Sequence, residues 1–113
     1  MTESEFLALA DRTLGAIEAA LERASNDGDL DVECSRSGNV LEIEFVDNGS
    51  KIIVNSQTPM QEIWVAARSG GFHYKFEDGR WLNTRDKSEL FASLSTMVGE
   101  QGGAAVTLNG RDD

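Results

Sequence analysis

Residues 40–55 read VLEIEFVDNGSKIIVN and carry the clearest structural signal in the chain. Apolar side chains at positions 41, 43 and 45 alternate with Glu42 and Glu44, a period of two that is typical of a strand with one buried face. The dipeptide Asn48-Gly49 favours a tight turn because both residues accept a positive φ. We therefore expect two antiparallel strands, residues 40–46 and 51–55, joined by a hairpin.

Shorter patterns of the same kind lie on both sides of this hairpin. They predict strands over residues 31–34, 62–67, 72–76 and 80–83. Thr58-Pro59 interrupts pairing after the hairpin, and turns that contain glycine separate the later strands. Residues 105–108 fit either a last short strand or a tail. Because the connections are short, the strands should follow one another in an antiparallel meander.

Helical patterns occupy the two ends of the chain. Apolar residues recur every three to four positions over residues 4–24, which predicts an amphipathic helix with a capping box formed by Thr2 and Glu5. A second helix should be capped by Asp86, with Glu89 in its first turn, and run to about residue 100. We therefore expect an α+β fold, a two-layer α/β sandwich in which the N- and C-terminal helices pack on one face of an antiparallel sheet of about six strands.

Composition limits the function. The length of 113 residues suits a single domain, residues 1–113. The net charge of −10 argues against nucleic acid and membrane surfaces as ligands, because both attract Lys and Arg. The single cysteine, Cys34, cannot form an internal disulfide, and an acidic N-terminus is atypical of a signal peptide, so we expect a cytoplasmic protein.

The negative charge is concentrated in one part of the chain. Residues 1–47 hold twelve acidic and three basic residues, whereas residues 48–113 hold eight and seven. Asp11, Glu18 and Glu22 fall on one side of the first helix. Every second residue from 27 to 33 is acidic, and these side chains would point the same way if the stretch is extended. Such a surface suits a metal cation or a basic partner, and solubility alone is the other interpretation.

A second motif lies in residues 55–66, which read NSQTPMQEIWVA. Asn-x-Gln-x-Pro followed by Ile-Trp-Val-Ala resembles the signature of the frataxin family, with Glu62 and Val65 standing where that family usually has Gln and Leu. The first helix and the segments 27–31, 49–55 and 70–73 resemble the bacterial members of the family. The resemblance covers residues 1 to about 98 and implies the same two-layer fold.

The resemblance also implies a function. Frataxins are small iron-binding proteins of iron–sulfur cluster assembly that bind the cysteine desulfurase and the scaffold protein, and the bacterial members regulate the desulfurase in response to iron. The resemblance implies a non-enzymatic monomer, with oligomerisation driven by iron left open. Carboxylates suit Fe²⁺ and Fe³⁺, and an exposed row of them should hold the ion weakly. The candidate iron ligands are Asp11, Glu18, Glu22, Asp27, Asp29, Asp31 and Glu33.

Two sets of residues are candidates for partner contacts. The first, expected to face a basic desulfurase, comprises Glu18, Glu22, Asp29 and Asp31. The second is on the sheet, where Trp64 is out of phase with its buried neighbours and should lie on the uncovered face beside Asn55 and Gln57. An exposed Trp at such a place indicates a protein contact, and a Trp packed flat over the sheet for stability is the alternative.

His73 is the only histidine and should lie on the same uncovered face. A single histidine cannot form a zinc site, but it could supply one axial ligand to haem, and an ordinary surface histidine is the simpler interpretation. Other functions also stay open at this point. They are a ferroxidase that oxidises Fe²⁺ at a carboxylate site, a haem-responsive protein, and an acidic interaction module without a metal.

Overall fold

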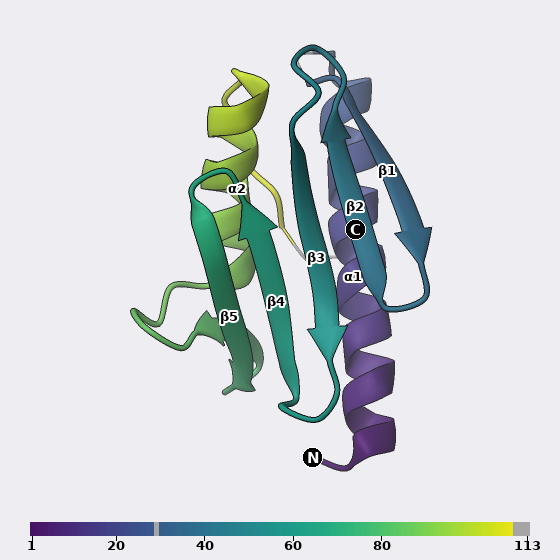
Figure 1. The fold of residues 1–113 in the computed structure, drawn as a ribbon, viewed down its shortest axis with the longest axis vertical. Coiled ribbons are helices and arrows are strands. Elements are labelled where there is room, and N and C mark those ends of the chain that lie inside the picture. Colours follow the sequence, from purple (N-terminus) through teal and green to yellow (C-terminus); the bar gives the residue numbers. More distant parts are fainter. Residues whose placement is uncertain (29, 110–113) are drawn as a thin grey trace.

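The computed structural model describes residues 1–28 and 30–109. Six strands form one antiparallel sheet in the order in which they occur in the chain, and both helices lie behind it in Figure 1. We call the side that carries the helices the helix face and the other side the open face. The expected two-layer α+β sandwich is confirmed. The elements are α1 (Glu3–Asn26), β1 (Val32–Ser37), β2 (Val40–Phe45), β3 (Lys51–Gln57), β4 (Glu62–Ala67), β5 (Gly70–Glu77), β6 (Arg80–Asn83) and α2 (Leu90–Gly102).

Helix α1 begins at the predicted capping box. The backbone N–H of Glu5 donates to Thr2 Oγ1 over 3.1 Å, and the backbone N–H of Thr2 donates to Glu5 Oε1 over 2.8 Å. Farther along the helix, an apolar stripe that includes Phe6, Leu14 and Ile17 is buried against the sheet. The periodicity of the sequence therefore predicted this helix to within two residues at its C-terminal end.

The register of the sheet decides which side chains meet on each face. Ile43 lies opposite Ile52, and Val54 lies opposite Val65, all four of them buried on the helix face. Residues directly opposite one another in an antiparallel pair share a face, so the alternating residues gather on the open face in rows across the strands. One such row runs through residues 55, 64 and 73 of β3, β4 and β5.

The central hairpin forms as expected, with a longer loop than a two-residue turn. Residues 46–50 connect β2 to β3, and Gly49 has a φ of 72°. Asn48 supports the loop on both sides, because its side-chain oxygen accepts from the Ser50 N–H and its side-chain nitrogen donates to the carbonyl of Gln101 in α2. Strand β1 extends to Ser37, beyond the predicted end at residue 34, because its pairing with β2 continues to Val40.

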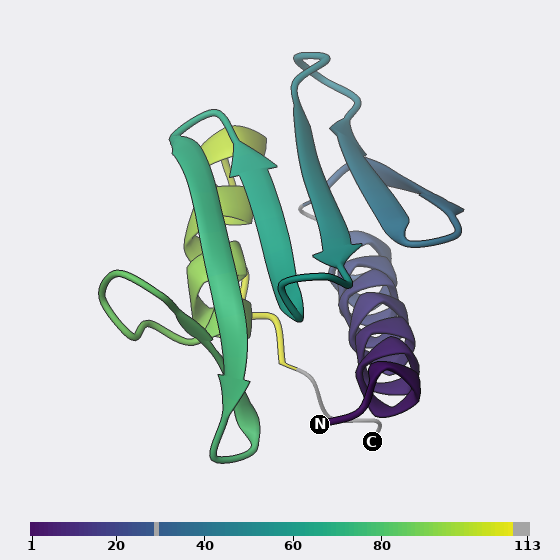
Figure 2. The ribbon, with the colours of Figure 1, turned by 60° about the horizontal axis from the view of Figure 1, so that its bottom comes forward.

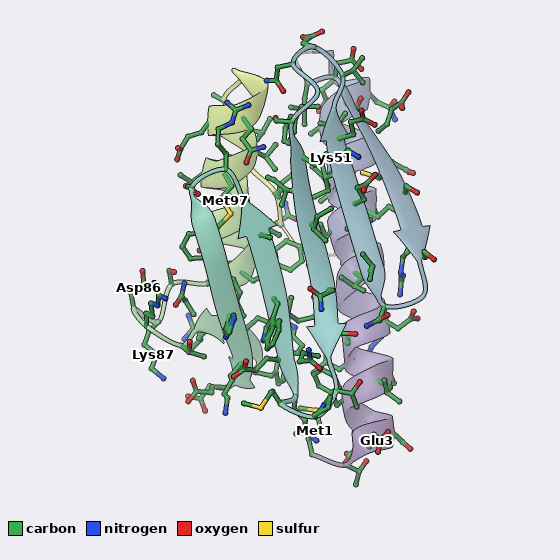
Figure 3. The ribbon with its side chains drawn as sticks, in the orientation of Figure 1. Met1, Glu3, Lys51, Asp86, Lys87 and Met97 are labelled. Carbon is green, nitrogen blue, oxygen red and sulfur yellow. The ribbon has the colours of Figure 1, made fainter. Side chains whose placement is uncertain are left out.

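The predicted start of the second helix is wrong. Glu89, rather than Asp86, is the N-cap, and its carboxylate accepts hydrogen bonds from the backbone N–H groups of Phe91 and Ala92. A β-bridge between Leu82 and Glu89 holds residue 89 in an extended conformation, so the helix starts only after it. Asp86 instead stabilises the loop before α2, visible in Figure 3, by accepting from the N–H and the hydroxyl of Ser88.

Helix α2 ends at Gly102, close to the predicted end at about residue 100, and Gly103 caps it with a φ of 68°. Residues 105–108 form no strand, but Leu108 is buried and its N–H donates to Ser95 Oγ of α2. The segment that follows α2 runs back along the helix face (Figure 2). Its residues line grooves beside α1. Neither helix in the described part of the chain has the length and hydropathy needed to cross a membrane.

Candidate functional site

The acidic residues of α1 border the edge strand β1. An open groove of about 510 Å³ runs between them, lined from α1 by Leu21, Glu22, Ser25 and Asn26 and from β1 by Val32, Glu33 and Cys34. Burial, with the negative charges of Glu18 and Glu22 as further causes, raises the pKa of the Cys34 thiol to about 11. Glu18 and Glu22 thus lie close enough to β1 to act on its side chains, on the same edge of the molecule as Glu33.

Asp11, the remaining acid of the helix stripe, already has a cationic partner. Its carboxylate forms an ion pair with Arg36 of β1, whose guanidinium also donates to the Asp11 carbonyl over 3.4 Å and to the Gly38 carbonyl over 3.3 Å. The Asp11 side chain is 72% exposed, so a cation can approach it. Because the positive charge of Arg36 offsets the negative charge of Asp11, Asp11 adds less to the negative potential around Glu18 and Glu22.

The acids between 27 and 33 do not form one extended row. Asp27 is the C-cap of α1 in a helical conformation, and only Asp31 and Glu33 continue into β1 as alternating, exposed residues. Asp29 lies outside the described residues. Within residues 1–28 and 30–109, no three His, Cys, Asp or Glu side chains are grouped so as to enclose a metal ion. The acidic residues are therefore arranged as a surface along an edge.

Two glutamates that were not predicted as site residues extend this surface onto the open face. Glu44 of β2 lies directly opposite Glu33, and Glu42 lies 3.5 Å, carboxylate oxygen to ammonium nitrogen, from Lys51. Lys51 is labelled in Figure 3 at the start of β3. The alternating pattern of residues 41–45 already assigned both glutamates to the wet face, so the signal was present in the sequence. We call Glu18, Glu22, Asp31, Glu33 and Glu44 the acidic edge.

A second feature lies in the middle of the open face. Trp64 of β4 and His73 of β5 are opposite one another, and their rings stack in parallel with centroids 4.4 Å apart and an interplanar angle of 8°. Asn55 of β3 lies opposite Trp64 on the other side, and Gln57 lies in the next row, opposite Glu62. The predicted sheet-face residues therefore come together as one surface, which we call the aromatic platform (Trp64 and His73 with Asn55).

Glu62 was not predicted to have a role, and it lies at the centre of this region. The Trp64 indole Nε1–H donates to Glu62 Oε1 over 2.8 Å, and His73 Nδ1 lies 3.5 Å from the same oxygen. Trp64 is thus half-buried and packed over the sheet, while His73 remains 50% exposed. In the sequence, Glu62 is notable only as a departure from the usual Gln, because a glutamate in an alternating strand is normally a solvated charge.

The other tryptophan belongs to the core. Trp81 is buried, its Nε1–H donates to Thr13 Oγ1 of α1 over 3.0 Å, and its ring packs edge-on against Phe6 and Phe76. It joins β6 to the first helix and contributes nothing to the open face.

Comparison with known proteins places this arrangement in a family. The family described as "Frataxin-like domain" matches residues 1–104. A protein of Herminiimonas arsenicoxydans named "Iron-sulfur cluster assembly protein CyaY" is 68% identical over 108 residues, 96% of either chain, and a protein of the same name from Ralstonia nicotianae is 60% identical over 96% of this chain and 95% of its own.

Solved structures agree with the sequence relatives. The frataxin of Psychromonas ingrahamii superposes with a TM-score of 0.84 at 32% identity, covering 96% of this chain and 99% of its own. The trimeric frataxin of the yeast Saccharomyces cerevisiae, solved in complex with ferrous iron, gives a TM-score of 0.71 at 26% identity over 83% of this chain and 85% of its own. With this fold, these relatives and a family match over nearly its whole length, the chain belongs to the frataxin family.

Proposed function

We propose that this chain is a cytoplasmic iron-binding protein of iron–sulfur cluster assembly that acts as an iron-dependent regulator or adaptor of the cysteine desulfurase and its scaffold protein. Close relatives carry the name of an iron–sulfur cluster assembly protein, and a yeast relative binds ferrous iron as a trimer. The observation that carries the proposal is the acidic edge, where carboxylates of α1, β1 and β2 meet at one border of the molecule.

The acidic edge supports iron binding of a particular kind. Carboxylate oxygens suit Fe²⁺ and Fe³⁺, and exposed, separated carboxylates leave water in the remaining coordination positions. Such a surface holds iron weakly and releases it, which suits a sensor better than a store. Asp11, being paired with Arg36, should bind iron less well than Glu22, and Asp27 and Asp29 complete the proposed ligand set with Asp31.

An anaerobic NMR titration with Fe²⁺ tests this. We expect broadening or shifts of amide signals in residues 11–33 and at Glu44, reduced in the Glu18→Gln/Glu22→Gln double variant and less reduced in Asp11→Asn. Glu100→Gln, which neutralises an exposed acid of α2, is the matched control. A titration in which residues 11–33 do not respond would remove the iron proposal.

The same edge is proposed to dock on a basic surface of the desulfurase, through Glu18, Glu22, Asp29 and Asp31. Complementary charge accelerates association and is weakened by salt. Charge reversal at Glu22 and Asp31 should therefore reduce desulfurase affinity more than charge reversal at Glu100, and the difference should shrink at high salt. Equal affinities for the two variants would contradict docking through this edge.

The aromatic platform is proposed as the scaffold-facing surface, with Gln57 at its border. Its experiment is a binding measurement with the purified scaffold protein, in which Trp64→Ala should lose affinity and Asn55→Ala should lose less.

Regulation of the desulfurase is tested separately. Desulfurase activity with and without this protein, at zero and at saturating iron, distinguishes an iron-dependent regulator from an acidic module that does not respond to the metal.

Two alternatives have direct tests. A ferroxidase would consume oxygen during Fe²⁺ addition at a rate proportional to protein concentration, whereas an adaptor would not. Haem binding through His73 would produce a Soret change that is lost in His73→Ala. The ring of His73 is half exposed, but one of its faces is covered by Trp64 and its Nδ1 faces Glu62, so the geometry favours the platform over a haem ligand.

The oligomeric state has its own test. Sedimentation with and without Fe²⁺ checks whether the chain is a monomer that iron assembles into oligomers.

A further inference from the structure

Glu62 is a charged side chain buried on a face of the sheet that no described helix covers. Its side chain is 6% exposed, while the neighbouring Lys75 and His73 side chains on the same face are about half exposed, at 53% and 50%. A carboxylate leaves water at a large cost in free energy unless hydrogen bonds or opposite charges replace the solvent. The groups that cover Glu62 must therefore make specific interactions with it.

Nitrogen atoms of three side chains from two strands lie around this carboxylate, and one of them donates a hydrogen bond to it. The Trp64 indole N–H donates to Oε1 over 2.8 Å, and His73 Nδ1 lies 3.5 Å from the same oxygen. Lys75 Nζ lies 3.9 Å from Oε2, as expected from the register, which places Lys75 directly opposite Glu62. From β3, the residue opposite Glu62 is the uncharged Gln57. The carboxylate thus accepts the indole N–H of the aromatic platform and lies within 4 Å of two further nitrogen atoms.

The interaction with Trp64 controls the orientation of its ring. An indole has one polar atom, a donor, and its ring can turn about the Cβ–Cγ bond into alternative orientations. Only an orientation that points Nε1 at Glu62 makes the 2.8 Å hydrogen bond, and in that orientation the ring lies parallel to His73 at 4.4 Å. The hydrogen bond and the stacking therefore select the same ring plane.

We propose that Glu62 is a positioning residue of the aromatic platform: by accepting the Trp64 indole N–H and lying beside His73 Nδ1, it fixes the plane of both rings before a partner arrives. The inference rests on the proposed role of the platform in partner binding. Because the indole donor is already used within the protein, the partner meets the faces and edges of the rings. Fixing these rings in advance reduces the entropy that association would otherwise lose.

The free protein provides the first test, because it has two tryptophans with different acceptors. Trp64 donates to Glu62 and Trp81 donates to Thr13, so ¹⁵N NMR should resolve two indole N–H signals with an internal reference. In Glu62→Ala we expect the Trp64 indole N–H to exchange with water about tenfold faster or more, because its acceptor is gone, while the Trp81 signal is unchanged. In Thr13→Val we expect the Trp81 indole N–H to exchange faster, while the Trp64 signal is unchanged.

The conservative variant separates positioning from general damage to the fold. Glu62→Gln keeps a carbonyl oxygen that can accept the indole N–H, so it should retain slow exchange of the Trp64 signal and the ring-current shifts of the His73 protons. If Glu62→Ala leaves both signals as in the wild type, or if Glu62→Gln loses them as Glu62→Ala does, the hydrogen bond does not position the ring and the inference is wrong.

Binding to the purified scaffold protein supplies the second readout. We expect Glu62→Ala to weaken binding by on the order of fivefold to tenfold although Trp64 is intact, and Glu62→Gln to bind within about twofold of wild type. If Trp64→Ala itself leaves the affinity unchanged, the platform is not the partner surface, and the NMR result on ring positioning stands independently. If Trp64→Ala weakens binding and Glu62→Ala does not, the platform survives and the positioning role is refuted.

Discussion

The reactivity of Cys34 depends on its burial and on the charges around it. It lies on the helix face of β1, opposite the buried Ile43, and it lines the groove that Glu22 borders. Burial first, then Glu18 and Glu22, raise the pKa of its thiol from 9.0 to about 11. Because the thiolate is the nucleophile, Cys34 should be a poorly reactive cysteine at physiological pH.

We expect iodoacetamide at pH 8 to alkylate Cys34 on the order of a hundredfold more slowly than a thiol of ordinary pKa, measured by mass spectrometry over time. Glu18→Gln/Glu22→Gln should speed the reaction, since removing nearby negative charge lowers the pKa of the thiol, whereas Glu100→Gln should not.

The raised pKa of the Cys34 thiol also makes folding pH-dependent. The contribution of Cys34 to stability should be constant below about pH 9 and fall as the pH rises towards 11, because the unfolded thiol ionises first.

The positions of individual side chains were more predictable from the sequence than their interactions. Alternation placed Trp64 and His73 on the open face, and both lie there. Alternation did not predict that Glu62 is buried, because burial of that carboxylate depends on which residues of β5 lie opposite it. The pairing of Asp11 with Arg36 likewise joins residues 25 positions apart and has no local signature.

The edge strand β1 combines its proposed function with a cost in stability. Glu33 and Glu44 lie directly opposite one another on adjacent strands, an arrangement of like charges that destabilises a sheet. Residue 44 is also opposite Lys51, which offsets part of the repulsion. In the proposed function, a cation or a basic partner that binds at this pair would relieve the repulsion.

Glu33→Gln should therefore raise the free energy of unfolding by roughly 0.2–1 kcal/mol while weakening Fe²⁺ binding, with urea denaturation and the NMR titration as the two measurements. Glu77→Gln is the matched control, because Glu77 pairs with Lys87 at 3.0 Å and has no acidic residue opposite it, Arg80 being its partner in β6. A stability unchanged by Glu33→Gln would mean that the two carboxylates do not interact.

The start of α2 provides a second contrast between elements. Glu89 accepts two backbone N–H groups of the helix, whereas Asp86 holds only the preceding loop. Glu89→Ala should cost about 1 kcal/mol of stability in urea denaturation, as expected for loss of an N-cap, and Asp86→Ala should cost less. The reverse order would restore Asp86 as the cap that the sequence predicted.

Elements with a clear internal pattern were predicted well from the sequence. The bounds predicted for β4 and β6, residues 62–67 and 80–83, are those of the structure. The errors lie at ends that tertiary contacts decide: β1 is lengthened by β2, and α2 is delayed by the bridge between Leu82 and Glu89. Local propensity contains no information about either contact.

The whole molecule carries its charge on one side. The net charge is −10, and most of it comes from residues 1–47, which form α1, β1 and β2. These elements lie next to one another at one end of the sheet in Figure 1. Repulsion among the negative charges at this end opposes folding, and the same charges attract cations. Both effects decrease as salt screens the charges.

Salt should therefore act in opposite directions on the free protein and on its complex. Raising NaCl from about 20 to about 300 mM should increase the Tm of the free protein by a few degrees and weaken its binding to the desulfurase. In Glu18→Gln/Glu22→Gln both responses should be smaller. A Tm that does not change with salt would show that the charge asymmetry has no effect on folding.

The strand order also has a consequence for biosynthesis. Each strand pairs with its neighbour in the chain, so the sheet can assemble hairpin by hairpin as the polypeptide leaves the ribosome, and α1 is available from the beginning to cover β1 and β3. Helix α2, which contacts β6 and whose Ser93 lies beside the buried Tyr74 of β5, is made only after all six strands. Nascent chains arrested between β6 and α2 should thus be the stage that chaperones recognise.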